Sequence, residues 1–207
     1  MTGYEEELVE MPSANTAALC NELLARCLAP VGERSEAAKA RVETLLVAER
    51  DAAIVDLRRL TFGDRVETDV ECPDCGAASH VSFDLTQVTL EAADVAEGLE
   101  VTLSDGRVAE LRLPTAGDQA DLLSAALSGA AERRSWLLER SIKRLGDTAG
   151  PLGFEKVHRL DSQTRRELER DLELEIPDLD LRVSATCEAC GREFAAPFDV
   201  ASFFLPS

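Results

Sequence analysis

The fold is decided by two short stretches that lie more than a hundred residues apart, Cys72-Pro73-Asp74-Cys75-Gly76 and Cys187-Glu188-Ala189-Cys190-Gly191. Their flanks match as well, because apolar or β-branched residues occupy every second position on both sides of each turn. Before the cysteines these are Val66, Thr68 and Val70 in one copy and Leu181, Val183 and Ala185 in the other; after them, Val81, Phe83 and Leu85 correspond to Ala196, Phe198 and Val200. The pattern predicts an internal repeat of strand, CxxCG turn and strand.

The chemistry of the turn explains why these residues recur. A CxxC turn directs two thiolates to one point, and the glycine that follows adopts a backbone conformation that side chains resist. Four thiolates at about 2.3 Å from the ion form the closed tetrahedral site that zinc favours. We therefore predict that Cys72, Cys75, Cys187 and Cys190 bind one structural zinc ion, as two halves of a single zinc ribbon.

Other uses of the cysteines fit the sequence less well. A redox CxxC motif belongs at the start of a helix, whereas both flanks here have strand patterning. Two separate metal sites would each need further ligands, and only the first turn has a nearby candidate, His80, where the second copy has Ala195. We expect His80 to be a surface residue. Cys20 and Cys27 lie on the apolar stripe of a predicted helix, where free cysteine commonly packs as a small core residue.

Composition limits the class of protein. The chain has 207 residues, 45% of them hydrophobic, and a formal charge of −18. It is long enough for a substantial core, and its acidity opposes nucleic-acid binding, which needs basic surface; acidity also simply favours solubility. No apolar run approaches the roughly 18 residues of a membrane span. The acidic N-terminus does not resemble a signal peptide, and reduced cysteines fit the cytoplasm.

Catalytic patterns are missing from the sequence. There is no phosphate-binding glycine loop or nucleophile elbow, and the two histidines, His80 and His158, lie far apart. A closed site of four thiolates has no open position at which to activate water. We therefore expect no enzyme activity and no small-molecule substrate.

Hydrophobic periodicity predicts an α+β fold with an N-terminal helical region over residues 1–62. It begins with an acidic arm or partner-contacting strand over residues 1–12, followed by a helix over 15–29. A second helix starts at a Ser35 cap and carries Val42, Leu45 and Leu46. A third, over 51–60, is expected to bury Ile54, Leu57 and Leu60 and to expose Arg58 and Arg59.

The split ribbon is predicted to occupy residues 63–88 and 178–202, with an insertion at 89–177 and an apolar end at 203–207. The insertion begins with strands at 99–103 and 109–113, whose apolar residues are all odd-numbered, so we expect a turn that is longer than two residues or bulged. Thr115 and Asp118 form a capping box before a helix. After Gly129 a second helix extends through Ile142 and Leu145, a loop covers 146–153, and a last helix covers 162–175.

Several of these segments together carry a family resemblance. They are Leu60-Thr61-Phe62-Gly63-Asp64-Arg65 before CPxCG, then Phe83-Asp84-Leu85, then Arg112-Leu113-Pro114-Thr115-Ala116-Gly117-Asp118-Gln119, and the closing CxxCG with Ala196-Pro197-Phe198-Asp199-Val200-Ala201-Ser202-Phe203. In this order they resemble baseplate-associated proteins of contractile phage tails and contractile injection systems, similar to the T-even phage baseplate hub and assembly proteins. The resemblance covers roughly residues 15–205 and implies a structural or assembly role at a tail baseplate.

Two functional hypotheses follow. The first is a zinc-stabilised module that contacts baseplate or tail proteins, with no nucleic acid, membrane or small-molecule partner. The alternative is a cytoplasmic zinc-ribbon adaptor or regulator that acts on nucleic acid or a polymerase, which would need a basic groove. The candidate partner surfaces are the acidic arm around Tyr4–Val9 and the apolar end Phe203–Leu205. For the apolar end there are two alternatives: it packs on the ribbon of its own chain, or it contacts another subunit.

Overall fold

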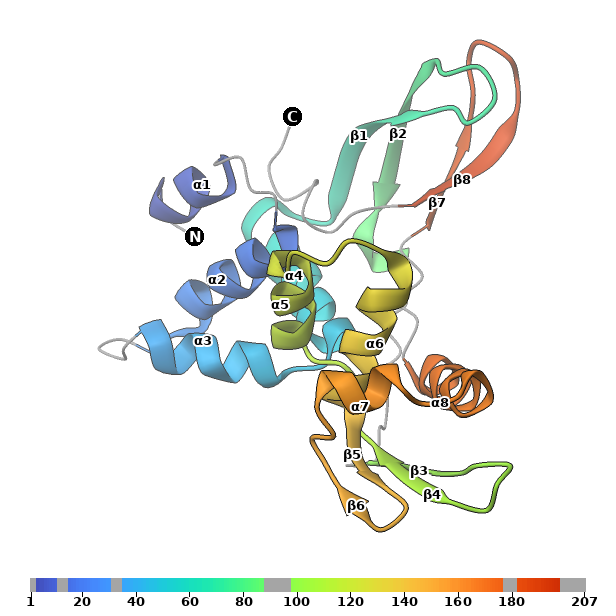
Figure 1. Cartoon of the computed structure of the whole chain (residues 1–207). Helices are drawn as coiled ribbons and strands as arrows, with labels where there is room; N and C mark the ends of the chain where they lie inside the picture. Colours follow the sequence, from blue (N-terminus) through green and yellow to red (C-terminus); the bar gives the residue numbers. More distant parts are fainter. Residues whose placement is uncertain (1–2, 11–14, 31–34, 88–97, 177–181, 198–207) are drawn as a thin grey trace.

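The computed structural model describes residues 3–10, 15–30, 35–87, 98–176 and 182–197 and has the predicted α+β architecture (Figure 1). The helices are α1 (Gly3–Glu10), α2 (Thr16–Leu28), α3 (Ser35–Thr44), α4 (Val47–Phe62), α5 (Ala116–Ser124), α6 (Ala130–Ser141), α7 (Phe154–His158) and α8 (Ser162–Glu175), with a 3₁₀ turn at Leu85–Gln87. The strands are β1 (Arg65–Glu71), β2 (Ala78–Asp84), β3 (Leu99–Thr102), β4 (Val108–Leu111), β5 (Ile142–Leu145), β6 (Thr148–Ala149), β7 (Arg182–Thr186) and β8 (Glu193–Pro197).

The acidic N-terminal segment is a helix, so the prediction of an arm or strand over residues 1–12 was wrong for its described part. Residues 3–10 form α1, in which glutamates and Leu8 have favourable helix propensity. Leu8 packs against the core formed by the following helices, whereas Tyr4 is 76% exposed. The packing of Leu8 on a core made by later helices is a contact that the sequence of the segment alone does not reveal.

The second predicted helix ends earlier and the third begins earlier than expected. Leu45 and Leu46 lie outside both α3 and α4, because their backbone pairs with the chain around Thr115. The Leu45 carbonyl accepts a hydrogen bond from the Ala116 N–H at 2.8 Å, and Leu46 forms an isolated bridge with Thr115. Glu49 then accepts from the Leu46 N–H at 2.8 Å, which fixes the first turn of α4.

The buried face of α4 also differs from the prediction. Leu60 is 87% exposed and Arg58 only 4% exposed, the reverse of what was expected. The helix buries residues spaced four apart, Arg50, Ile54 and Arg58. Arg58 is accommodated because its guanidinium donates hydrogen bonds to the carbonyls of Gly63 and Arg65, at 3.0 and 3.2 Å. A cationic side chain therefore occupies a position that periodicity alone assigns to an apolar residue.

Helix α5 belongs to the insertion in sequence but packs on the N-terminal helices α2 and α3 (Figure 1). The predicted capping box is present: the Thr115 hydroxyl accepts from the Asp118 N–H, and the Asp118 carboxylate accepts from the Thr115 N–H. Buried Asn21 of α2 donates to the Ala116 carbonyl at 3.0 Å. The insertion and the N-terminal region thus share a helical layer, and the domain boundaries drawn from the sequence remain a prediction.

The insertion contains a four-stranded antiparallel sheet in the order β3-β4-β5-β6. Leu99 pairs with Leu111 and Val101 with Ala109, so of the two expected alternatives, a longer or a bulged turn, the longer turn is the one present. Gly106 in that turn has a φ of 84°, a conformation that favours glycine. The prediction of a helix through Leu145 was wrong, since α6 ends at Ser141 and the next four residues form β5 beside β4. Long-range pairing overrides local helix propensity here.

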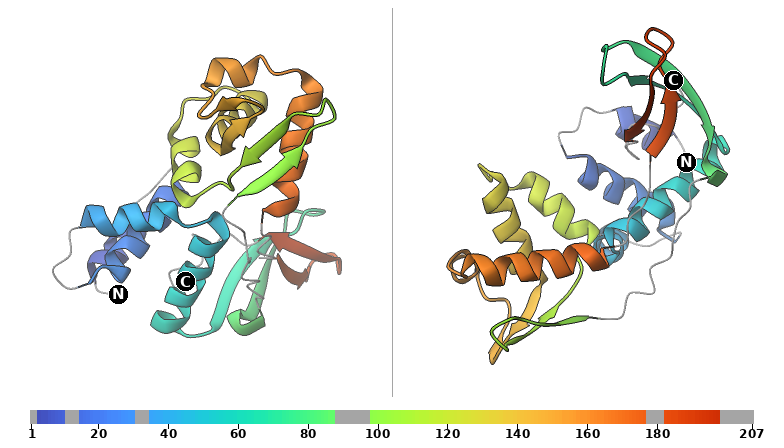
Figure 2. Two further views of the ribbon diagram at one scale, coloured as in Figure 1. Left: turned by 90° about the horizontal axis from the view of Figure 1, so that it is seen from below. Right: turned by 90° about the vertical axis from the view of Figure 1, so that its right-hand side faces the viewer.

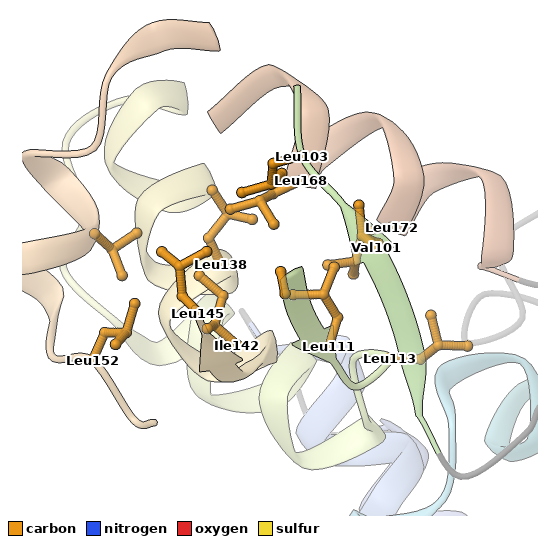
Figure 3. Close-up of a cluster of buried hydrophobic side chains, with 12 residues drawn as sticks. Val101, Leu103, Leu111, Leu113, Leu138, Ile142, Leu145, Leu152, Leu168 and Leu172 are labelled. Carbon is orange, nitrogen blue, oxygen red and sulfur yellow. The ribbon is translucent and has the colours of Figure 1, made fainter. Parts of the chain in front are cut away.

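The insertion has its own hydrophobic core between this sheet and helices α6, α7 and α8 (Figure 3). Helix α8 has the predicted bounds, and its Leu168 and Leu172 are buried in this core together with Leu103, which follows β3, and Leu138 of α6. A separate N-terminal core joins α2, α3 and α4 to the first hairpin through Val66 and Leu85. The part of the chain that the structure describes therefore has two distinct cores.

The two CxxC segments form separate hairpins, β1–β2 and β7–β8, that lie side by side at one end of the molecule (Figures 1 and 2). Their pairing is equivalent position for position: Thr68 opposes Val81 in the first hairpin, and Val183 opposes Ala196 in the second. The predicted internal repeat is therefore present in the described strands. Leu181, Phe198 and Val200 lie outside the described residues.

Candidate metal centre

Each CxxCG turn is built by the same two backbone hydrogen bonds. In the first, the Cys72 N–H donates to the Ala77 carbonyl and the Gly76 N–H donates to the Cys72 carbonyl, both at 2.9 Å. The second repeats these bonds at 2.8 Å, from Cys187 to Arg192 and from Gly191 to Cys187. Gly76 and Gly191 have φ values of 70° and 74°, which explains why glycine follows the second cysteine of each turn.

The two turns meet and bring together the four cysteines named from the sequence. The sulfurs of Cys72 and Cys190 are 3.8 Å apart and those of Cys75 and Cys187 are 3.5 Å apart. All four lie within 4.8 Å of one another. Four sulfurs at about 2.3 Å from a central ion in a tetrahedron are separated by roughly 3.8 Å, so this arrangement fits one thiolate-bound metal ion. The site is thus of the zinc-ribbon kind.

Burial and proton affinity distinguish the four thiols. The first cysteine of each turn, Cys72 or Cys187, is buried at 1% exposure, and the second is exposed. The Cys190 backbone N–H is the main influence on Cys187 and lowers its pKa to about 6, against the effect of burial. For Cys75 the Ala77 backbone lowers the pKa, but hydrogen bonding with Cys187 and desolvation outweigh this and raise it to about 12. Thiolates, not thiols, bind a metal dication, so metal binding at these cysteines would release protons.

An ion pair that the sequence reading missed connects the two turns outside the sulfurs. Arg192 directly follows the second CxxCG and contacts the Asp74 carboxylate inside the first. Asp74 raises the pKa of the Arg192 guanidinium through this hydrogen bond. Both side chains are about half exposed, so the pair orients the turns more than it stabilises them. The only sequence feature that could have suggested this ion pair is the opposite charge of Asp74 in the first turn and Arg192 after the second.

The other cysteines and His80 lie apart from this centre. Cys20 is buried in the N-terminal core and Cys27 packs at its edge, as predicted, and burial raises the pKa of the Cys27 thiol. His80 is exposed on the first hairpin, with its Nδ1 3.0 Å from a carboxylate oxygen of Asp69. Among the described residues, no other group of three or more histidine, cysteine or carboxylate side chains converges in this way.

Fold and site together define an α+β protein with a split, four-cysteine, zinc-ribbon-like centre. The sequence profile described as "T4 bacteriophage base plate protein" matches residues 1–205, and the chain belongs to this family. This confirms the resemblance seen in the sequence and supports a structural or assembly role at a phage baseplate. No curated protein and no solved structure matches the chain significantly. Within the described residues, no helix combines the length and apolar character needed to cross a membrane.

Proposed function

We propose that the protein is a non-enzymatic component or assembly factor of a contractile, phage-tail-like baseplate, in which one zinc ion holds the two hairpins together for contacts with other tail proteins. Membership of the baseplate family supports the setting. The convergence of four cysteines from two distant, equivalent turns carries the argument for the metal. In this proposal the protein meets its partners in the cytoplasm.

The ligands in this proposal are Cys72, Cys75, Cys187 and Cys190, and the ion is structural. Four thiolates fill a tetrahedral coordination shell, so no position remains for a reacting water. Four-thiolate tetrahedral sites also suit iron, and we choose zinc because the two ribbon turns have the typical zinc-ribbon pattern. The acidic residues that face outward on β1, Glu67, Asp69 and Glu71, oppose nucleic acid as a partner.

Metal analysis of the purified protein tests the site. The expected result is one zinc per chain, no visible absorption from iron, and loss of the metal on replacing any of the four cysteines with serine. Cys20→Ser is the matched control, because Cys20 is a cysteine outside the centre, and it should retain one zinc. A protein that purifies without zinc after expression in zinc-supplemented medium contradicts the metal assignment.

Co-expression with the other baseplate and tail proteins tests the setting. The protein is expected to co-purify with at least one of them in a fixed ratio, and the cysteine variants are expected to lose that association along with the metal. Wild-type protein that carries zinc but associates with no tail protein would contradict the baseplate role while leaving the metal site intact.

A further inference from the structure

One face of the first hairpin is turned toward the second, and it carries a buried serine. Strand β2 contacts β7 of the second hairpin, and the two hairpins lie side by side (Figures 1 and 2). In the second hairpin Ala185 and Cys187 are buried, whereas Thr186 between them is exposed. Strand β2 buries Ser79 and Val81 and exposes the residues between and on either side of them. Because side chains alternate between the two faces of a strand, Ser79 belongs to the inner face.

The strand register places Ser79 beside the first cysteine of its own hairpin. Ser79 lies directly opposite Val70, and Cys72 follows Val70 by two residues. The pairing continues to the turn, where the Cys72 N–H donates to the Ala77 carbonyl at 2.9 Å. Residues two apart on a strand share a face, so Cys72 and Ser79 are diagonal neighbours on the inner face. Both side chains are only 1% exposed.

The hydroxyl of Ser79 is a buried donor without an acceptor. Its Oγ has no hydrogen-bond partner within the part of the chain that the structure describes, although buried hydroxyls normally have one. The second hairpin shows that the fold does not require a hydroxyl at this position. There the half-buried Phe194 opposes Ala185 as Ser79 opposes Val70. An apolar residue is therefore sufficient for the hairpin, and the serine needs another explanation.

The sulfurs of the cysteine centre are the candidate acceptors. As thiols they contact one another, with Cys72 and Cys190 at 3.8 Å and Cys75 and Cys187 at 3.5 Å. As thiolates they have no S–H group to donate, and four of them around a dication leave the centre with a net negative charge. Cys72 and Cys187 are buried, so solvent does not stabilise the charge on their sulfurs. A buried charge without hydrogen bonds is costly, and a hydroxyl on the same face can reduce that cost.

We infer that Ser79 is a positioning residue of the proposed metal centre, and that its hydroxyl donates a hydrogen bond to the Cys72 thiolate when the four cysteines hold an ion. This bond stabilises the negative charge on a sulfur that solvent does not reach, and it restricts the orientation of the side chain. Hydrogen bonds from residues outside the ligand set orient metal ligands and change metal affinity in this way. The inference rests on the metal site of the proposed function and is independent of the baseplate role.

Competition with a chelator measures the effect on zinc affinity in the full chain. Ser79→Ala should bind zinc about 10–100-fold more weakly than the wild type, because the Cys72 thiolate loses a donor. Ser82→Ala is the matched control, since Ser82 lies on the same strand but is exposed. It should bind zinc as tightly as the wild type.

The absorption spectrum of the cobalt-substituted protein reports on the sulfurs directly. Thiolate-bound Co²⁺ has absorption bands in which charge moves from sulfur to metal, and a hydrogen bond to sulfur lowers the energy of the sulfur lone pairs. Loss of that bond in Ser79→Ala should therefore shift the bands to longer wavelength, whereas Ser82→Ala should leave them in place. If Ser79 only contributed packing, its replacement would change stability without this shift.

Thermal unfolding in excess chelator tests whether the hydroxyl has a partner other than the metal-bound thiolate. Without metal, Ser79→Ala should melt at the same temperature as the wild type or higher, because it removes a hydroxyl that lacks a partner. A clear fall in melting temperature would mean that the hydroxyl is bonded elsewhere in the chain and would overturn the inference.

The outcomes separate this inference from the proposed metal site. If Ser79→Ala and the wild type have equal zinc affinities, or if the cobalt spectrum does not shift, the inference is wrong while the four-cysteine site stands. A wild-type protein that binds neither zinc nor cobalt would overturn the metal site and the role of Ser79 together.

Discussion

Replacing Cys72 with serine changes the first hairpin, but its main effect is expected in the second. No residue of β7–β8 whose side chain the structure describes belongs to either hydrophobic core. The buried side chains known in this hairpin are Ala185, Cys187 and Ala196. The first hairpin, in contrast, is anchored in the N-terminal core through Val66 and Leu85. Loss of the proposed zinc ion should therefore release the second hairpin and leave the first largely in place.

The size of this effect depends on the other interactions that keep the second hairpin in place. Burial of two alanine methyl groups contributes about 1.5 kcal/mol, and the exposed contact between Asp74 and Arg192 adds little. Zinc binding in small zinc domains is coupled to about 10–16 kcal/mol of folding free energy. If only about a third of this stabilises the hairpin, roughly 4 kcal/mol, loss of zinc raises the opening equilibrium about a thousandfold.

Hydrogen–deuterium exchange with mass spectrometry, together with metal analysis, measures this effect. In Cys72→Ser, peptides within residues 182–197 should lose protection by about three orders of magnitude, while those containing Leu24 or Leu168 should exchange as in the wild type. Cys20→Ala is the control. It is expected to keep its zinc and to lower the free energy of unfolding only as much as a small core truncation does. A zinc-free Cys72→Ser protein with full protection of the second hairpin would show that this reasoning is wrong.

Three further predictions concern stability. Arg58→Ala should lower the free energy of unfolding by about 2–3 kcal/mol in urea titrations, because two backbone carbonyls lose their buried donor; a change below about 0.5 kcal/mol contradicts this role. Leu168→Ala should cost about 2–5 kcal/mol, since the side chain is 0% exposed, whereas Leu174→Ala should stay within about 0.5 kcal/mol. Burial opposes ionisation of Asp118, but the Arg112 hydrogen bond and the Thr115 N–H outweigh it and lower the pKa of the carboxyl. Its stabilisation is therefore complete above the unfolded pKa of about 3.9 and is lost as the pH falls through the lower folded pKa. Unfolding titrations between pH 2 and pH 7 should accordingly show a weaker acid dependence in Asp118→Asn, and identical profiles would exclude this carboxyl as a contributor.

The sequence was sufficient where a signal is local and repeated. The CxxCG turns, the Thr115–Asp118 capping box and the bounds of α8 depend on residues close in sequence, and each was predicted. The candidate metal centre could also be predicted although its halves lie far apart, because four thiolates satisfy one tetrahedral ion and the two turns have equivalent flanks. The fold class followed from the same repeat and from helical periodicity.

The predictions that were wrong concern segments whose local structure depends on contacts with residues distant in sequence. Arg58 is buried and Leu60 exposed because carbonyls beyond the end of α4 give the guanidinium partners. Ile142–Leu145 forms a strand because β4 offers an open edge. The N-terminal segment is a helix whose Leu8 packs on a core made by later helices.

The sequence by itself determined the two hairpins, their four cysteines and most helix starts, since hydrogen bonds and ligand geometry between near neighbours specify them. Only the tertiary structure decided the pairing of Asp74 with Arg192 and the packing of α5 on the N-terminal helices. Each of these depends on where separate elements meet in space, and their burial and electrostatic energies arise only after that meeting.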